Sequence, residues 1–192
     1  MIKNLVVTFA AGIGLTLSAS LVAFGAPVVS VEPQLTSVLP GDIVSLDVRA
    51  SDLGDLFAFE FDVGFSPAIL SALSITEGAF LSGAGSTLFV PGSIENATGR
   101  ISLTTGTLIG PGPGAIGSGV LATLQFRALS SGSGAIQLSN VLLLNSAVED
   151  IDAEVQAGRV AVVPEPCSFA LLVLGGLALL LMRRTKPART AS

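Results

Sequence analysis

Short stretches in which apolar and polar residues alternate recur along this chain, separated by Gly, Pro and Asp. The clearest is FAFEFDVGF at 57–65, which has Phe or Val at every odd position and Ala58, Glu60 and Asp62 between them. A period of two places successive side chains on opposite faces of a β-strand. Between residues 27 and 163 no apolar stripe with helical spacing is longer than about two turns. The pattern therefore predicts an all-β fold.

The same alternation predicts a series of short strands separated by turns. They fall at residues 29–31, 43–50, 57–65, 100–105, 120–128, 136–144 and 155–163, with a turn at 39–42. Short strands with Gly and Pro turns are typical of an antiparallel two-sheet sandwich, and one polar face per strand indicates that both outer faces are in water. Asn96 begins a match to the glycosylation sequon, but we expect it to support the turn before Gly99.

The charge of the middle of the chain limits its partners. Residues 27–163 contain thirteen acidic residues, four arginines and no lysine, a net charge of −9. Such a body repels phosphate backbones, which excludes nucleic acid as a partner. A length of 192 residues allows one ordinary domain, and the single cysteine, Cys167, leaves residues 27–163 without a disulfide.

Side chains suited to catalysis are scarce. The chain has no histidine, so acid–base triads and zinc sites lose their commonest group. A glycosidase needs only two carboxylates, but there is no Trp or Tyr to line a sugar cleft. We therefore expect no enzyme, no catalytic residue, no metal ligand and no cofactor. Calcium is the one metal considered, through Asp52, Asp55 and the acidic run 149–154, whose spacing matches no known calcium loop.

Residues 1–25 have the organisation of a secretory signal peptide. Lys3 supplies a positive charge, residues 5–17 form a largely apolar segment, and small residues gather at 23–26. Cleavage after Gly25 is favoured, because cleavage one residue later would place Pro27 directly after the cut bond. An uncleaved anchor helix is the alternative. The pattern predicts an exported protein.

A short hydrophobic segment lies near the other end of the chain. Residues 167–182 carry no charge and as a helix would span roughly 24 Å, somewhat less than the ~30 Å hydrocarbon core of a bilayer. Four basic residues follow between 183 and 189, which favours a transmembrane helix with its C-terminus in the cytoplasm and the body outside. A buried core helix is the alternative.

Three features of this end, within residues 164–189, resemble a known sorting signal. They are the tripeptide Pro164, Glu165 and Pro166, the hydrophobic helix 167–182, and the arginines Arg183 and Arg184. Together they resemble the PEP-CTERM signal. The resemblance implies a Gram-negative bacterium that makes an exopolysaccharide, and an exosortase, a membrane protease that cuts near the Pro-Glu-Pro. It also implies passage through the inner membrane, anchored by the tail, to the cell surface or the extracellular matrix.

The order of motifs between residues 27 and 163 resembles a second family. A Pro-Gly-Asp turn at 40–42 leads into a strand, FAFEFDVGFSPAIL follows at 57–70, an acidic-Gly pair stands at 77–78, and GVLATLQFRA at 119–128 precedes IQLS at 136–139. This order resembles the cohesin-type domain, a jelly-roll sandwich related to cellulose-binding modules. The resemblance implies binding of a calcium-loaded dockerin module through one outer sheet face.

Glu60 and Asp62 are the candidate binding residues of such a face. Glu60 falls near a position that is often an outward aspartate in the family, and Asp62 has the same parity along the strand. Both residues also fit the ordinary solvated face of a strand. Phe80 and Phe89 are candidates for stacking on a sugar, provided that they are exposed.

Three non-catalytic functions remain open. The first is an exported surface or matrix module, sorted by an exosortase and associated with exopolysaccharide and biofilm. The second is a cohesin-type module that recognises a dockerin-like protein, which predicts an exposed apolar patch on one outer sheet. The third is a carbohydrate-binding module. The expected partners are the exosortase during processing and a surface polysaccharide or a protein afterwards.

Overall fold

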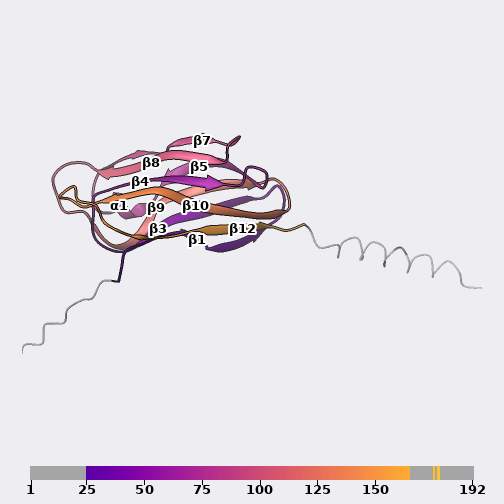
Figure 1. Ribbon diagram of the computed structural model, residues 1–192, viewed down its shortest axis with the longest axis horizontal. Helices are drawn as coiled ribbons and strands as arrows, with labels where there is room; N and C mark the ends of the chain where they lie inside the picture. The colour runs from indigo at the N-terminus through magenta and orange to yellow at the C-terminus, as the bar shows by residue number, and fades with distance from the viewer. Residues whose placement is uncertain (1–24, 165–174, 176, 178–192) are drawn as a thin grey trace, which may run out of the picture.

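The computed structural model describes residues 25–164, together with the isolated positions 175 and 177. The described residues form two β-sheets packed face to face and one short helix (Figure 1). The predicted two-sheet sandwich is therefore confirmed. The elements are β1 (Val28–Glu32), β2 (Leu35–Val38), β3 (Ile43–Leu56), β4 (Ala58–Phe65), β5 (Leu70–Glu77), α1 (Ala79–Ser82), β6 (Thr87–Val90), β7 (Ser93–Glu95), β8 (Arg100–Leu108), β9 (Ala115–Ala128), β10 (Gly132–Leu144), β11 (Glu154–Gln156) and β12 (Gly158–Val162).

One sheet has five strands in the order β11-β1-β3-β9-β5. Its centre is the antiparallel pair of the two long strands β3 and β9, in which Leu46 lies opposite Leu124. Along the first half of β3 every second residue is buried, as the alternation predicts. The strand continues past its predicted end at residue 50 as far as Leu56, with shifts of register after Val48, Ala50 and Leu53.

The other sheet has the order β2-β12-β10-β4-β8-β6, and β7 also pairs with β8. β4 lies between β10 and β8 and is antiparallel to both. Phe59, Phe61, Val63 and Phe65 of β4 are buried against the first sheet, so the predicted inward face of this strand is confirmed. This arrangement leaves the other side of β4 at the centre of an outer sheet face.

Two strand pairs are parallel, β1 with β11 and β2 with β12, which corrects the expectation of a wholly antiparallel sandwich. The chain passes from β1 in the five-stranded sheet to β2 in the seven-stranded sheet, and it passes from β11 to β12 in the same way. Because both crossings run in the same direction side by side, the pairs they form are parallel. The predicted strand 155–163 is accordingly two strands, divided at Ala157.

Side chains from both sheets form one hydrophobic core. Phe65 of β4 and Phe126 of β9 meet edge to face across the sandwich, with ring centroids 5.2 Å apart. Phe59 stacks on Phe61 at 5.8 Å. Such ring pairs contribute about 0.5–1.5 kcal/mol beyond the apolar area that they bury. Among the described residues the buried polar side chains are few: Ser30, Asp62 and Thr104.

The strands β2, β5, β6 and β7 and the helix α1 were not among the predicted elements. α1 places Phe80 directly over β9, where a Cβ added at Gly119 would lie 2.6 Å from the Phe80 ring. The preceding Gly78 passes even closer to β9, because its Cβ would fall 2.1 Å from the Val120 carbonyl oxygen. These two glycines allow α1 to cover the end of the five-stranded sheet.

The described chain enters and leaves at opposite ends of the sandwich (Figure 1). Pro27 accepts a hydrogen bond from the Glu154 N–H at one end, and Val163 donates one to the Val38 carbonyl at the other. The predicted signal peptide 1–25 and the predicted sorting signal 164–189, with its helix 167–182, lie outside the described residues except for Gly25, Pro164 and the isolated positions 175 and 177. Within the described part of the chain, no helix is long and apolar enough to cross a membrane.

Candidate binding face

Asp62 is buried, with a side chain only 6% exposed. Its carboxylate accepts three hydrogen bonds: the Leu103 N–H donates to Oδ1 at 2.8 Å, and Arg100 Nη2 and Asn140 Nδ2 donate to Oδ2 at 2.5 and 2.7 Å. The expectation that Asp62 lies on a solvated strand face is therefore wrong. Groups from both neighbouring strands bond to the carboxylate and cover it.

The neighbours of Asp62 both bulge where they pass it. On β10 the register with β4 shifts between Ser139 and Leu142, and on β8 it shifts opposite the step from Phe61 to Val63. Each shift adds one residue to the neighbouring strand, which is the definition of a β-bulge. Asn140 and Leu103, the bulge residues that bond to Asp62, have φ angles of 51° and 59°.

The protonation state of Asp62 follows from these contacts. Burial alone raises the pKa of its carboxyl, but the hydrogen bonds from the Leu103 N–H, Arg100 and Asn140, with the charge of Arg100, outweigh burial and hold the pKa below its ordinary value. The carboxylate is therefore ionised at neutral pH. Because its side chain is buried and its oxygens already accept three hydrogen bonds, Asp62 is not placed to meet a partner directly.

The outer side of the seven-stranded sheet exposes several aliphatic side chains beside the polar residues Glu60, Thr105 and Thr107. Leu88 and Val90 of β6, Leu103 of β8 and Leu142 of β10 are 57, 47, 61 and 40% exposed. The expectation that both outer faces are polar is therefore wrong for this sheet, whereas the exposed apolar patch expected of a cohesin-type module is present. We name as the apolar face the following residues: Ala58, Leu88, Val90, Leu103, Leu142 and Leu144.

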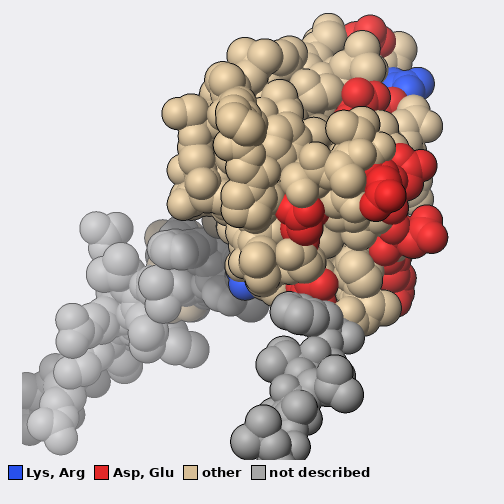
Figure 2. All heavy atoms as spheres, turned by 90° about the vertical axis from the view of Figure 1, so that its left-hand side faces the viewer, with Lys and Arg blue, Asp and Glu red and all other residues tan. Residues whose placement is uncertain are grey.

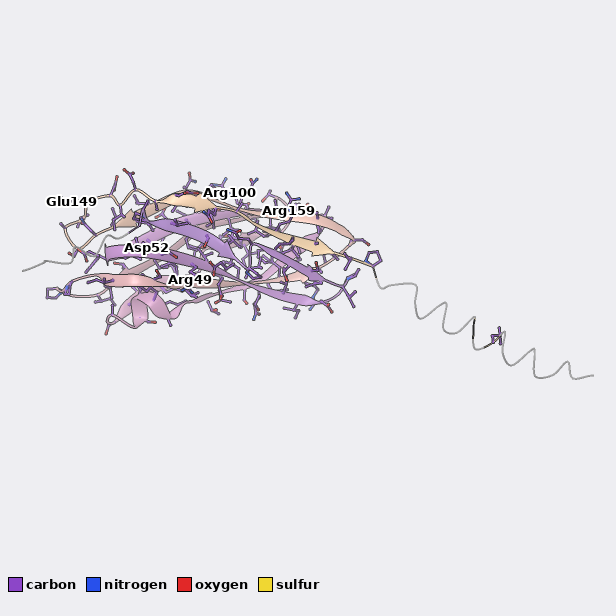
Figure 3. The ribbon with its side chains drawn as sticks, turned by 90° about the horizontal axis from the view of Figure 1, so that it is seen from below. Arg49, Asp52, Arg100, Glu149 and Arg159 are labelled. Atoms are coloured by element: carbon purple, nitrogen blue, oxygen red, sulfur yellow. The ribbon has the colours of Figure 1, made fainter. Side chains whose placement is uncertain are left out.

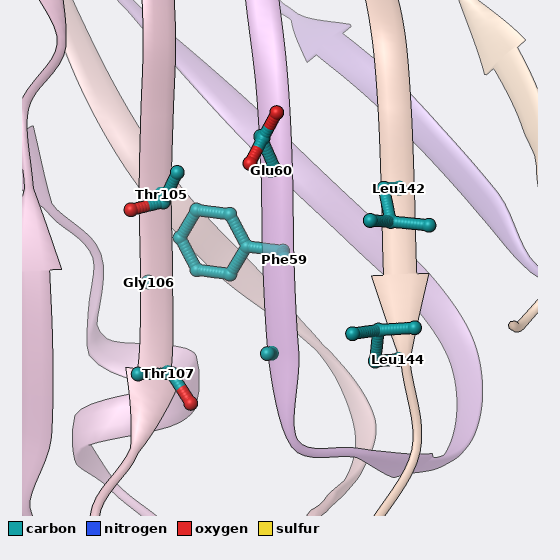
Figure 4. Close-up of a pocket in the computed structure, with 8 residues that line it drawn as sticks. Phe59, Glu60, Thr105, Gly106, Thr107, Leu142 and Leu144 are labelled. Carbon is teal, nitrogen blue, oxygen red and sulfur yellow. The ribbon is translucent and has the colours of Figure 1, made fainter. Parts of the chain in front are cut away.

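The strand registers arrange most of this face in two rows across β6, β8, β4 and β10. One row is Leu88, Thr107, Ala58 and Leu144, and the other is Val90, Thr105, Glu60 and Leu142. Each row has aliphatic side chains at its two ends and a small or polar residue on the central strands. The centre is therefore lower than the flanks, and a shallow depression of about 240 Å³ lies there (Figure 4).

Glu60 stands in this depression, between Thr105 and Leu142 (Figure 4). The ion pairs within residues 25–164 are Arg49 with Glu32 and Arg100 with Asp62, so none of them involves Glu60. In Figure 3 Arg100 and Arg159 lie on the layer of the seven-stranded sheet and Arg49 lies on the other layer. The apolar face thus has a carboxylate at its centre that no described cation neutralises.

The outer side of the five-stranded sheet is different. Thr123 Oγ1 donates a hydrogen bond to Asp47 Oδ1 at 2.6 Å, and Ser74 Oγ donates one to Gln125 Oε1 at 3.2 Å. These polar pairs occupy outward positions of β3, β9 and β5. Exposed aliphatic residues also occur in this sheet, at Ile43, Leu73, Ile116 and Val155, but the strand registers do not place them opposite one another. The two outer faces therefore differ in how their exposed aliphatic side chains are arranged.

Two of the residues considered for calcium, Asp55 and Glu149, are engaged in side-chain contacts within the protein. Asp55 accepts hydrogen bonds from the Gly114 N–H and from the N–H and hydroxyl of Ser146, and Glu149 accepts one from Asn145 Nδ2. Among the residues that the structure describes, no group of three or more Asp, Glu, His or Cys side chains is placed to hold a metal ion. These acids connect the loops at one end of the sandwich.

Acidic side chains gather along one side of that end (Figure 2). Most of the remaining surface in this view is neither acidic nor basic. An acidic surface of this kind attracts cationic partners over distances of about one Debye length.

The aromatic residues considered for stacking on a sugar are not free to do so. Phe80 and Phe89 are partly buried and pack against the core, and the Phe89 ring lies 6.5 Å from that of Phe59. An aromatic platform needs an exposed ring face. The described surface therefore lacks a Phe80 or Phe89 platform.

These features define a class of protein: a jelly-roll β-sandwich that presents one apolar sheet face. The family model of the Cohesin domain matches residues 29–162, and the chain belongs to this family. No curated protein matches the chain.

Solved structures with the same fold share little sequence with this chain. The sixth cohesin of scaffoldin B from Acetivibrio cellulolyticus, in complex with a dockerin, is 20% identical with a TM-score of 0.58, over 72% of this chain and 100% of that one. An OlpA cohesin–dockerin complex from Clostridium thermocellum is 11% identical with a TM-score of 0.59, over 72% and 100%. A non-cellulosomal cohesin from the archaeon Archaeoglobus fulgidus is 11% identical with a TM-score of 0.58, over 77% and 98%.

Sequence reasoning placed Glu60 on the face but missed most of the residues around it. Thr105 and Thr107 lie in or beside a predicted strand, yet only the register with β4 brings them next to Glu60 and Ala58. Leu142 has an apolar side chain that points outward because the bulge before it inverts the alternation of β10. A one-residue bulge leaves no mark in the hydrophobic pattern that distinguishes it from a buried run.

Proposed function

We propose that this domain is a non-catalytic recognition module that binds a partner protein through the apolar face. The observation that carries the proposal is the pair of rows across β6, β8, β4 and β10, which places exposed aliphatic side chains on the outer side of a sheet around one carboxylate. A contiguous exposed apolar patch is more often an interaction site than a surface that stays in contact with solvent. Membership of the Cohesin domain family and the dockerin complexes of solved cohesins support the same function.

The charges of the face favour one kind of occupant. The rows would meet an apolar strip of the partner, and Glu60 would meet a Lys or Arg within that strip. A second copy of this domain is disfavoured, because residues 27–163 carry a net charge of −9 and a symmetric contact through this face would bring Glu60 of both copies into it. The proposed occupant is therefore a dockerin-like module with a cationic, apolar surface. Calcium in such a complex would belong to the partner.

The test uses the purified full chain as bait, on envelope and culture medium of the producing organism, with and without calcium. Leu142→Asp places a charge in the apolar face, and Leu73→Asp does the same on the five-stranded sheet. The two leucines have the same exposure, 40%, so the two substitutions are a matched pair.

The proposal expects one protein partner that is captured by the wild type and by Leu73→Asp, and that is lost with Leu142→Asp and on chelation of calcium. Equal capture by both variants would refute the apolar face as the site. Capture of polysaccharide alone would favour the carbohydrate-binding alternative.

We also propose that the module is exported and sorted to the cell surface or extracellular matrix. The proposal rests on the signal-peptide pattern of residues 1–25 and on the resemblance of residues 164–189 to the PEP-CTERM signal. In this proposal, an exosortase recognises Pro164, Glu165 and Pro166 together with Arg183 and Arg184. The module then takes part in a matrix that contains exopolysaccharide.

Mass spectrometry of the protein recovered from envelope and medium tests this second proposal. A mature chain that begins near residue 26 and ends near residue 166 is expected. Glu165→Ala should leave the uncut form in the membrane fraction, and a wild-type chain recovered with residues 167–192 intact would contradict the proposed cleavage.

A further inference from the structure

The Asp62 cluster, which we define as Asp62, Arg100, Leu103 and Asn140, joins three adjacent strands through one carboxylate. Asp62 is the only carboxylate among the buried polar residues of the described chain. An ionised group is costly to bury unless it is fully hydrogen-bonded. Here the carboxylate accepts hydrogen bonds from three residues, two of which, Leu103 and Asn140, belong to bulges.

The two bulge residues have a backbone conformation that is uncommon for residues other than glycine. Leu103 has a φ of 59° and Asn140 a φ of 51°, both in the left-handed region. Asparagine tolerates that region, whereas leucine rarely adopts it. Leu103 must therefore be held there by its surroundings, and the one side-chain hydrogen bond to its N–H comes from Asp62 Oδ1 at 2.8 Å.

The conformation of Leu103 determines what the apolar face presents. Leu103 interrupts the pairing of β8 with β4, and its side chain is 61% exposed, the most exposed of the large apolar residues on that face. Without the bulge, the residues of β8 beyond position 103 would move to the opposite side of the sheet, because a shift of one residue exchanges the two faces of a strand. The same argument applies to Leu142 beyond the bulge at Asn140 on β10.

We infer that Asp62 is a positioning residue for the binding face: its buried carboxylate fixes the bulges at Leu103 and Asn140 and thereby sets which apolar side chains the face exposes. The role in binding rests on the proposed function, whereas the role in fixing the bulges does not. Asp62 thus acts through Leu103 and Leu142 and not by touching the partner.

Nuclear magnetic resonance of the full chain tests the inference without a partner. A residue with positive φ gives a strong intraresidue NOE between its amide proton and Hα. In Asp62→Asn one carboxylate oxygen becomes an NH2 group, which faces either the Leu103 N–H or the donors Arg100 and Asn140, and the negative charge that all three donors share is lost. The variant is expected to lose this signature at residues 103 and 140, and the Leu103 amide is expected to exchange with solvent about tenfold faster or more. The control is Asp47→Asn, which removes a hydrogen-bonded strand carboxylate of the other sheet and should change neither signal.

A rescue experiment separates positioning from general stabilisation. Glycine adopts positive φ without strain, so the double substitution Leu103→Gly with Asn140→Gly should restore the bulges in the Asp62→Asn background. The rescue also applies if Asp62→Asn alone does not fold. Unchanged signals at residues 103 and 140 in Asp62→Asn would overturn the inference. So would a glycine background in which the amide at position 103 still exchanges as fast as in Asp62→Asn.

Binding provides the last comparison. With a partner captured through the apolar face, Asp62→Asn and Leu103→Ala should both weaken capture by about tenfold, and Asp47→Asn should not. Altered bulges with unchanged capture would overturn the role of Asp62 in binding. If the wild type captures no protein, the proposed function fails, and the amide signals alone decide whether Asp62 fixes the bulges.

Discussion

The side chain of Asn96 pairs with the backbone of Ala72 through both of its polar groups. Oδ1 accepts a hydrogen bond from the Ala72 N–H at 2.7 Å, and Nδ2 donates one to the Ala72 carbonyl at 3.0 Å. Asn96 follows β7 in the seven-stranded sheet, and Ala72 belongs to β5, the edge of the five-stranded sheet. The amide thus takes the place of a neighbouring strand and connects the two sheets at an otherwise open edge.

This pairing makes Asn96 important for stability. Ala72 is 4% exposed, so truncation of Asn96 would leave its N–H and carbonyl without partners in a site that water reaches poorly. We expect Asn96→Ala to lower the free energy of unfolding by about 1–3 kcal/mol, measured by urea denaturation with an unchanged m value. Asn96→Asp should also destabilise, because a carboxylate oxygen would then face the Ala72 carbonyl. A change below about 0.5 kcal/mol in Asn96→Ala would show that the pairing contributes little.

Asn96 also shows what the sequence could reveal. A turn before Gly99 was predicted, and the Thr98 N–H does bond to the Glu95 carbonyl there. The contact with Ala72, twenty-four positions away in sequence, depends on how the two sheets stack, which no local pattern encodes. The local turn was therefore predictable, whereas the partner of the side chain was not.

Gly106 of β8 lies opposite Phe59 of β4, next to the buried Phe59 ring. A Cβ added at Gly106 would lie 2.5 Å from the Phe59 ring, which is buried and stacked on Phe61. We expect Gly106→Ala to destabilise the domain by about 1–3 kcal/mol, because the ring cannot move without disturbing the core. The control is Gly54→Ala in β3, where no atom lies within 4 Å of the added Cβ. Thermal unfolding of both variants makes the comparison, and equal losses would contradict the packing argument.

Long alternating strands were predictable because their burial follows a single rule. In β4 and in the first half of β3 every odd or every even residue faces the core, and both strands were located from that pattern alone. β5, β6 and β7 were not, because they are short or contain a bulge such as that between Ala72 and Ser74. Asp62 fits the alternation of β4 perfectly and is still buried, because the covering groups come from bulges in its neighbours.

The lowered pKa of two aspartates gives the domain a defined response to acid. For Asp62, burial opposes ionisation but the hydrogen bonds from Leu103, Arg100 and Asn140 prevail. For Asp55, the hydrogen bond from the Ser146 hydroxyl is the main cause; burial opposes it, and the hydrogen bonds from the Gly114 and Ser146 N–H groups add to the lowering. A carboxyl whose pKa is lower in the folded state stabilises the fold above its unfolded pKa, and the stabilisation is lost as the pH falls through the folded pKa.

We therefore expect the free energy of unfolding to be nearly constant from neutral pH to about pH 5 and to fall below that. Asp62→Asn should be less stable than the wild type at pH 7 and should show a shallower fall below pH 5, since it has lost one of the titrating groups. Urea denaturation between pH 7 and pH 3 measures both. Parallel curves for the wild type and Asp62→Asn would mean that the pKa of Asp62 is not lowered by folding.

The last prediction concerns the charge of the partner surface that Glu60 would meet. If Glu60 meets a Lys or Arg, Glu60→Gln should weaken capture by roughly two- to fivefold at low salt, and the difference should shrink as salt screens the pair. Glu154→Gln in β11 of the five-stranded sheet removes the same unit of net charge away from the apolar face, and it should have a smaller effect. Surface plasmon resonance at two ionic strengths separates these outcomes. Tighter binding by Glu60→Gln would instead indicate that the partner buries this carboxylate without a cation, because an unpaired charge costs more to desolvate than an amide.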